Sequence, residues 1–288
     1  MLRISSIFSE YTVIRLYHGL LRRYGWIKDY QTYRKTFKSI ALPPIGTKGK
    51  LLFVAGRGMN ITWAQMWTYL GVSCRAAGYA PAVILLRKQW LHKLYFRLIN
   101  ARIYILEDCL NSSSSSFPLS KLDDLHTASD WKQIKHKNMP VGAMVLSTYC
   151  RHNATGFIDP TLPDFLPFAK EWAKNICQAY DAAEDFYKKN DVKTAMFSET
   201  FIEEYGGFYY AALAAGLDVI KTNGTVRDNA IVVQRRQAEN ERLHHAALTN
   251  NAWEYITKLG NDTEIQQEVA KNFADRYSNK WLRSKRNH

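Results

Sequence analysis

Residues 50–60 carry the pattern in this chain that best predicts ligand binding. Their apolar first half is typical of a buried strand, and Gly56 and Gly58 then predict a tight turn that exposes backbone N–H groups. Asn60 or Thr62 can cap the helix that follows. A strand, a turn and a helix N-terminus form a polar cradle, which binds ligands at the carboxyl edge of open parallel sheets. The third glycine of the dinucleotide-binding fingerprint is absent. The alternative to a ligand-binding cradle is a plain strand-to-helix turn.

Arg57 lies between these two glycines, at the end of the predicted strand. A guanidinium there can bind a phosphate through two parallel hydrogen bonds. The alternative is an ion pair with an acid such as Glu199 or Asp228. For Asn60 we favour the role of helix cap over that of a substrate ligand, because Asn is a preferred capping residue.

Two later segments place polar groups where we expect the same edge of the sheet. Gly206 and Gly207 permit the backbone to approach a ligand closely, or they form only a tight turn. Asn223, Gly224 and Arg227 follow another expected strand, and the carboxyl ends of parallel strands share one edge. The substrate-binding candidates are therefore Arg57, Gly58, Asn60, Gly206, Gly207, Asn223, Gly224 and Arg227.

Length and composition indicate a globular protein with anionic partners. The chain has 288 residues, 47% of them hydrophobic, and a formal net charge of +13. This content can form a sizeable core, and the charge is concentrated at the two ends. The four cysteines have no C-x-x-C spacing, so we expect reduced thiols in the cytoplasm. No apolar run approaches the ~20 residues that span a bilayer.

Alternating strand and helix patterns predict an α/β fold with a doubly wound, mostly parallel, Rossmann-like sheet. We expect a helical leader at residues 1–46, the Rossmann-like domain at 47–255 and a helical tail at 256–288. The pattern at 142–147 fits a short strand or a helix start equally well. The expected strands are 51–55, 81–86, 103–106, 195–198, 217–222 and 230–233, and the expected helices of the leader and domain include 7–38, 61–77, 88–100, 164–189 and 208–215, with 199–207 as a loop.

The leader helix has two interpretations. Apolar residues recur at helical spacing and leave Arg15, Arg22 and Arg23 on another side. Such a helix can lie on an anionic membrane surface, at the inner face of the plasma membrane, with Tyr and Trp side chains at the headgroups. Alternatively it packs on the domain and its basic face meets water, which we favour. Gly19 and Gly25 are expected to weaken it or to break it into two helices.

Three segments resemble, in order and spacing, the amino-terminal half of bacterial glycosyltransferases of the GT-B type. These enzymes build capsular and other surface polysaccharides, and the resemblance covers roughly residues 50–255. The segments are Val54-Ala-Gly-Arg-Gly-Met-Asn60 running into Trp63-Ala64, Met144-Val-Leu-Ser-Thr-Tyr-Cys-Arg151 with Gly156-Phe-Ile-Asp159, and Phe197-Ser-Glu-Thr-Phe-Ile-Glu-Glu-Tyr-Gly-Gly207 with Ala211–Gly216 and Val219–Gly224.

The resemblance implies two Rossmann-like domains that face each other across a cleft. The amino-terminal domain takes the glycan acceptor, and the carboxyl-terminal domain binds the nucleotide-sugar without a tightly bound metal. This chain has the pattern of one such domain, so we expect a truncated or split transferase whose partner is a second GT-B half. We expect no cofactor and no metal site, since the neighbouring His244 and His245 cannot face one ion.

The resemblance also implies a general base in this domain, which takes the proton of the acceptor hydroxyl. Several relatives carry a histidine in the loop after the strand that corresponds to 195–198. Here that loop reads Ser198-Glu199, so Glu199 is the first candidate, with Glu203 and Glu204 next. The alternative for Glu203 and Glu204 is structural, because acids stabilise the N-terminal end of a helix.

A different class of function is a non-catalytic subunit that binds a glycan or a partner transferase. The expectation of a single domain supports this alternative. Nucleic-acid binding is disfavoured despite the positive charge, because no recognition helix or basic, aromatic-interleaved strand motif is present in the sequence.

Overall fold

The computed structural model describes residues 10–55, 60–201, 203–224 and 231–236, together with five single positions beyond residue 262. The chain divides into two compact units, Met1–Asn240 and Glu241–His288. The continuous described segments all belong to the first. Its strands are β1 (Lys50–Val54), β2 (Ala80–Leu85), β3 (Arg102–Ile105), β4 (Val192–Phe197), β5 (Asp218–Gly224) and β6 (Ile231–Arg236). Its helices are α1 (Glu10–Ser39), α2 (Ile61–Ala76), α3 (Trp90–Arg97), α4 (Leu106–Asn111), η2 (Leu119–Leu122), α5 (Ala128–Gln133), α6 (Val141–Asn153), α7 (Phe165–Lys189) and α8 (Glu203–Ala214).

The strands form one six-stranded sheet in the order β3-β2-β1-β4-β5-β6. Strands β1 to β5 pair in parallel, and β6 pairs antiparallel with β5. This order, with its reversal between β1 and β4, is that of the Rossmann fold. The prediction of an α/β, doubly wound and mostly parallel sheet is therefore confirmed.

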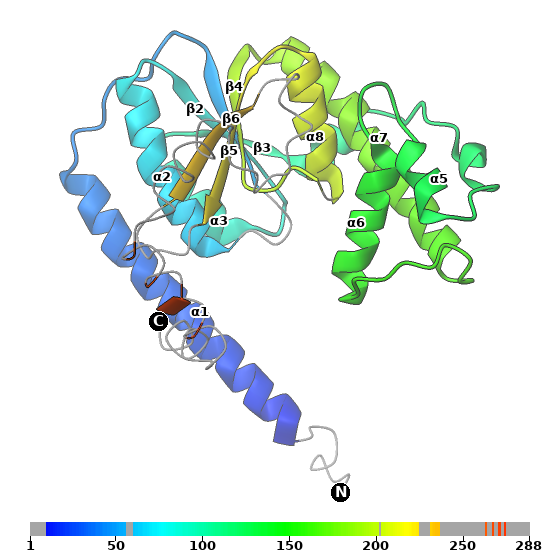
Figure 1. Cartoon of the computed structure of the whole chain (residues 1–288). Helices are drawn as coiled ribbons and strands as arrows, with labels where there is room; N and C mark the ends of the chain where they lie inside the picture. The colour runs from blue at the N-terminus through cyan, green and yellow to red at the C-terminus, as the bar shows by residue number, and fades with distance from the viewer. Residues whose placement is uncertain are drawn as a thin grey trace, which may run out of the picture. The chain divides into compact units, whose positions relative to one another are not determined.

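Helices cover the two faces of the sheet and form two hydrophobic layers (Figure 1). Phe53 of β1 points into the layer of α1, α2 and α3. Leu52 and Val54, its neighbours along the strand, point into the layer that holds α4 to α8. Because both faces are covered, the central strand β1 is apolar and buried from Leu51 to Val54.

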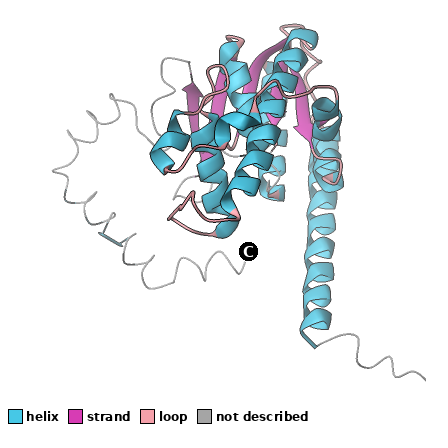
Figure 2. Ribbon diagram, turned by 90° about the vertical axis from the view of Figure 1, so that its right-hand side faces the viewer, coloured by secondary structure: helices cyan, strands magenta, loops and turns pink. Residues whose placement is uncertain are grey.

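Helix α1 is unbroken, so of the two effects expected of its glycines the division into two helices is wrong. Its C-terminal part packs on the sheet layer through Trp26, Tyr30, Tyr33 and Phe37. The ring of Tyr33 contacts that of Tyr95 on α3 in an edge-to-face arrangement at 5.3 Å. The N-terminal part of α1 extends beyond the other described elements of its unit (Figure 2). Among the described helices, none combines the length and the apolar character needed to cross a membrane.

A long crossover between β3 and β4 contains helices α4 to α7. Residues 142–147, left open between strand and helix, lie in α6. Asp181 of α7 holds the crossover together, since its carboxylate accepts hydrogen bonds from Ser116, His136 and Lys137. The buried Asp181 carboxyl would have a raised pKa from burial alone, but these hydrogen bonds outweigh that effect and lower the pKa.

Candidate functional site

The sheet order places several candidate residues at one edge of the sheet. The strand order reverses between β1 and β4, and β1 leads into α2 on one face while β4 leads toward α8 on the other. Ligands of open α/β folds bind outside the carboxyl ends of the strands at such a reversal. Asn60 follows β1, and Glu199 and Glu203 follow β4, so the structure places these three predicted residues at this edge. Arg57 and Gly58 lie outside the described residues.

Asn60 is the N-cap of α2. Its side-chain oxygen accepts a hydrogen bond from the backbone N–H of Thr62 at 3.3 Å. Helix capping is the role that the sequence predicted for Asn60, and its side-chain oxygen is engaged in the cap.

Glu199 lies beside two cations. Its carboxylate is 3.5 Å from the guanidinium of Arg151, and both side chains are about half exposed. The second cation is Lys221 of β5, whose charge interacts with that of Glu199. Arg151 comes from the C-terminal end of α6, so Glu199 links the helix to the sheet edge.

Glu203 pairs with a histidine at this edge. Its Oε1 atom lies 3.2 Å from Nε2 of His152, and the Glu203 side chain is only 10% exposed. The backbone N–H of Glu203 donates a hydrogen bond to Oγ1 of Thr148 at 3.2 Å. Thr148 and His152 are one turn apart on α6, so a single face of that helix holds both the backbone and the carboxylate of Glu203.

The ring of His152 has a fixed orientation but keeps contact with solvent. It packs against Trp172 at 4.9 Å and edge-to-face on Phe168 at 5.7 Å, both on α7. Its side chain is 39% exposed. A histidine with one nitrogen on a buried carboxylate and an exposed remainder is an arrangement suited to general acid–base chemistry.

The segment after Glu199 differs from the predicted loop, because α8 already begins at Glu203. Glu203 and Glu204 are the acids of its first turn, as their structural alternative assumed. Gly206 and Gly207 are buried inside this helix, where they allow α8 to approach α6 and α7 closely. The sequence suggested a ligand contact or a tight turn for them, and the helix shows that the turn was wrong.

Strand β5 is longer than predicted. Asn223 and Gly224 were expected to follow the strand, but they belong to it, because they pair with Val232 and Ile231 in the β5–β6 ladder. The backbone of Asn223 and Gly224 therefore belongs to the sheet itself. Arg227 lies outside the described residues.

Lys221 is a buried cation on the same strand. It is 3% exposed and lies between Phe197 of β4 and Gln234 of β6. Burial lowers its pKa from 10.5 to about 8; Glu199 opposes this shift, and the charge of Arg236 adds to it. The charged ammonium of Lys221 therefore destabilises the folded protein when no anion is bound next to it.

We expect Lys221→Met to raise the free energy of unfolding at neutral pH by an amount on the order of 1–3 kcal/mol. Between pH of about 8 and 10.5 the unfolded chain binds more protons at this residue than the folded one. Wild-type stability thus rises with pH in that interval, and the difference between variant and wild type should shrink. Urea unfolding across this range measures it, with the exposed Lys188→Met as control. A difference in unfolding free energy between Lys221→Met and wild type that does not change with pH would contradict the lowered pKa of Lys221.

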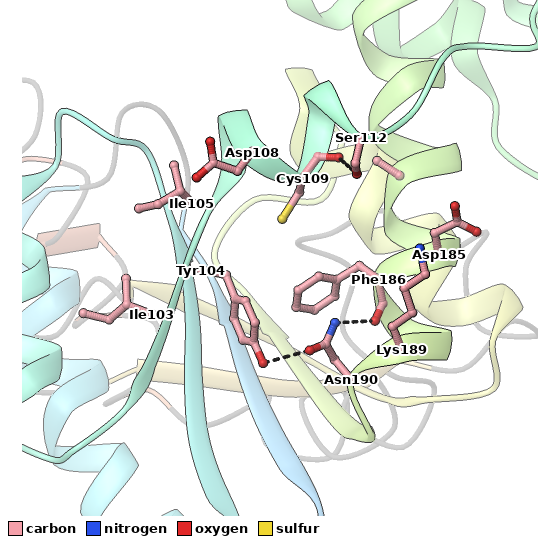
Figure 3. A pocket seen from close by; sticks show the side chains of 11 residues that line it. Ile103, Tyr104, Ile105, Asp108, Cys109, Ser112, Asp185, Phe186, Lys189 and Asn190 are labelled. Carbon is pink, nitrogen blue, oxygen red and sulfur yellow. Dashed lines mark hydrogen bonds between the residues drawn. The ribbon is translucent and has the colours of Figure 1, made fainter.

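A separate pocket of about 380 Å³ lies against the edge strand β3, between α4 and the end of α7 (Figure 3). Its size falls within the range of ligand pockets. The polar groups of its wall are mostly engaged: Tyr104 donates to Asn190 at 2.9 Å, and Asn190 donates to the carbonyl of Phe186. Burial, with a smaller effect of Asp108, raises the pKa of Cys109 to about 11, so its thiol is a weak nucleophile. The pocket is also lined by Asp108, Asp185 and Lys189, and its thiol is not a candidate nucleophile.

Among the described residues, no group of His, Cys, Asp and Glu side chains is arranged to hold a metal ion. No family model matches the chain, and the comparisons with curated proteins and with solved structures also give no match.

Arg151 and His152 were not among the site residues predicted from the sequence, since a histidine beside an arginine is typical of a solvated loop. Sequence reasoning overlooked Lys221 altogether. The spacing of four residues between Thr148 and His152 places both on one face of a helix. It could have indicated His152 only if residues 141–153 had been predicted to form that helix. For Lys221 the signal was its place inside an apolar strand, since a buried lysine is rare without a function or a partner.

Proposed function

We propose that this chain is the acceptor-side domain of a GT-B type glycosyltransferase in surface polysaccharide assembly. The donor is a nucleotide-sugar, the acceptor is a glycan, and residues 256–288 lead to a second domain or subunit that binds the donor. The observation that carries this proposal is the His152–Glu203 pair at the carboxyl edge beyond β4. The resemblance of three segments to such enzymes supports it. The four free thiols fit a cytoplasmic protein.

In this proposal His152, rather than Glu199, is the general base. With its proton on Nε2 bonded to Glu203, the imidazole can accept the proton of the acceptor hydroxyl on Nδ1. The hydroxyl oxygen forms a bond to the anomeric carbon of the donor sugar. The bond from that carbon to the nucleoside diphosphate breaks, and its electron pair leaves with the diphosphate. Glu203 stabilises the imidazolium, so it is the positioning residue.

Glu199 is a weaker candidate because it is half exposed and paired with Arg151. The guanidinium of Arg151 already engages its carboxylate. In the proposed site Glu199 instead holds Arg151 and interacts with Lys221, two cations suited to an anionic substrate group. The three glutamates predicted from the sequence thus have separate roles, with Glu204 buried in the first turn of α8.

The test is turnover by the purified chain, alone and mixed with a candidate donor-binding polypeptide, on a panel of nucleotide-sugars with glycan acceptors. We expect release of nucleoside diphosphate only in the mixture. Binding of a glycan without turnover in any combination would replace the transferase by a non-catalytic binding subunit. Failure to bind either substrate would remove both functions.

A further inference from the structure

Helix α1 presents two different sides within its described part. Trp26, Tyr30, Tyr33 and Phe37 recur at helical spacing and face the layer of α2 and α3. Another stripe faces away, with Tyr24 69% exposed and Ile27 42% exposed. The fold therefore uses only one side of this helix.

The outward stripe changes character along the helix. Tyr24 and Ile27 are followed, at the same helical positions, by four exposed cations: Lys28, Arg34, Lys35 and Lys38. The sequence of α1 contains seven Lys or Arg and only two acids, Glu10 and Asp29. Among the described side chains, the outward stripe thus has an apolar half at Tyr24 and Ile27 and a cationic half after it.

We propose that this outward stripe of α1 binds the surface of a membrane that contains anionic phospholipid. A helix of this kind lies in the interface, with its apolar residues at the boundary of headgroups and acyl chains. The cations next to the folded domain meet the negative headgroups, and each contributes to binding at moderate salt. In this proposal α1 lies on the surface of the membrane and does not cross it.

The charge of the outward stripe argues against two other occupants, a second copy of the chain and the chain's own C-terminal tail. A second copy in parallel orientation would place four cations against the same four cations. An antiparallel copy would place the cationic half of each helix against the apolar half of the other. The chain's own C-terminal tail is also basic, with Lys271, Arg276, Lys280, Arg283, Lys285 and Arg286. An anionic lipid surface is the occupant that satisfies both halves.

The test is co-flotation of the full chain with vesicles of phosphatidylcholine alone and of phosphatidylcholine mixed with phosphatidylglycerol. We expect binding to the anionic vesicles only, decreasing with added salt. Lys28→Gln with Lys35→Gln should weaken binding about fivefold per lysine, and Ile27→Gln about tenfold. The matched control is Lys132→Gln with Lys135→Gln, which removes two exposed cations from another part of the chain and should bind like wild type.

These positions are exposed, so the variants should keep the wild-type thermal unfolding midpoint, which separates loss of binding from loss of folding. Equal binding to neutral vesicles, or no binding to either kind, would overturn the proposal. So would a concentration-dependent dimer of the full chain that Ile27→Gln dissociates, because a second copy would then occupy the stripe. The test needs no turnover, so its failure would leave the proposed transferase unaffected.

Discussion

Replacing His152 by alanine is expected to reduce glycosyl transfer by a factor of about 10²–10⁴, the usual contribution of a general base. The variant removes the group that accepts the hydroxyl proton and leaves the binding surface in place. His152 is partly exposed and lies at the end of α6, so the free energy of unfolding should change by only about 1 kcal/mol. The measurement is kcat for release of nucleoside diphosphate by the chain mixed with the candidate donor-binding polypeptide of the proposed transferase.

Two further variants separate the roles at this edge. Glu203→Gln keeps the shape of the positioning residue but removes its charge, so we expect a smaller loss of kcat than for His152→Ala, with little change in KM. Glu199→Gln should act mainly on KM, because Glu199 holds Arg151 in place. The opposite result, in which Glu199→Gln has no activity and His152→Ala is active, would show that Glu199 is the base.

Replacing Gly207 by alanine should cost roughly 1–3 kcal/mol of folding free energy or more, as overpacking does. A methyl carbon there would lie 2.7 Å from the carbonyl oxygen of Ile176 and 2.7 Å from the amide nitrogen of Tyr180. Both are backbone atoms of α7, so no side-chain rotation can relieve the contact. The two helices must separate, and α8 carries Glu203 away from α6 as they do.

The matched control is Gly25→Ala, in the interior of another helix. A Cβ atom at Gly25 meets no atom within 4 Å. Alanine there should stabilise the protein by about 0.5–1 kcal/mol, the difference in helix propensity. Urea unfolding of both variants measures the two effects. Equal and small effects at the two positions would show that α8 does not pack on α7 as closely as the structure has it.

The sheet and its large helices could be predicted from the sequence because they depend on local pattern. The apolar spacing and polar C-terminal end of 164–189 define α7 almost to the residue. Gly206 and Gly207 show the limit of this reasoning. A glycine pair favours a turn locally, but the close contact between α8 and α7 overrides that preference.

The candidate site was predictable only in part. Its position followed from the fold class, since the carboxyl ends of β1 and β4 meet at the reversal of strand order. The pairing of Glu203 with His152 could not be predicted, because it joins residues 51 positions apart through the packing of two helices. The burial of Lys221 likewise depends on a neighbouring strand, β6, that is antiparallel to the rest.

The contacts of Glu203 with α6 also have a consequence for the order of folding. Thr148 and His152 precede it by 55 and 51 residues, and the whole of α7 and β4 lies between them. Such non-local contacts form late, after the intervening chain has paid its loop-closure entropy. A nascent or partly unfolded chain can contain α6 complete and still lack the pair. The proposed catalytic pair should therefore form only after α7 and β4 have docked, and it should be lost when α8 separates from α6.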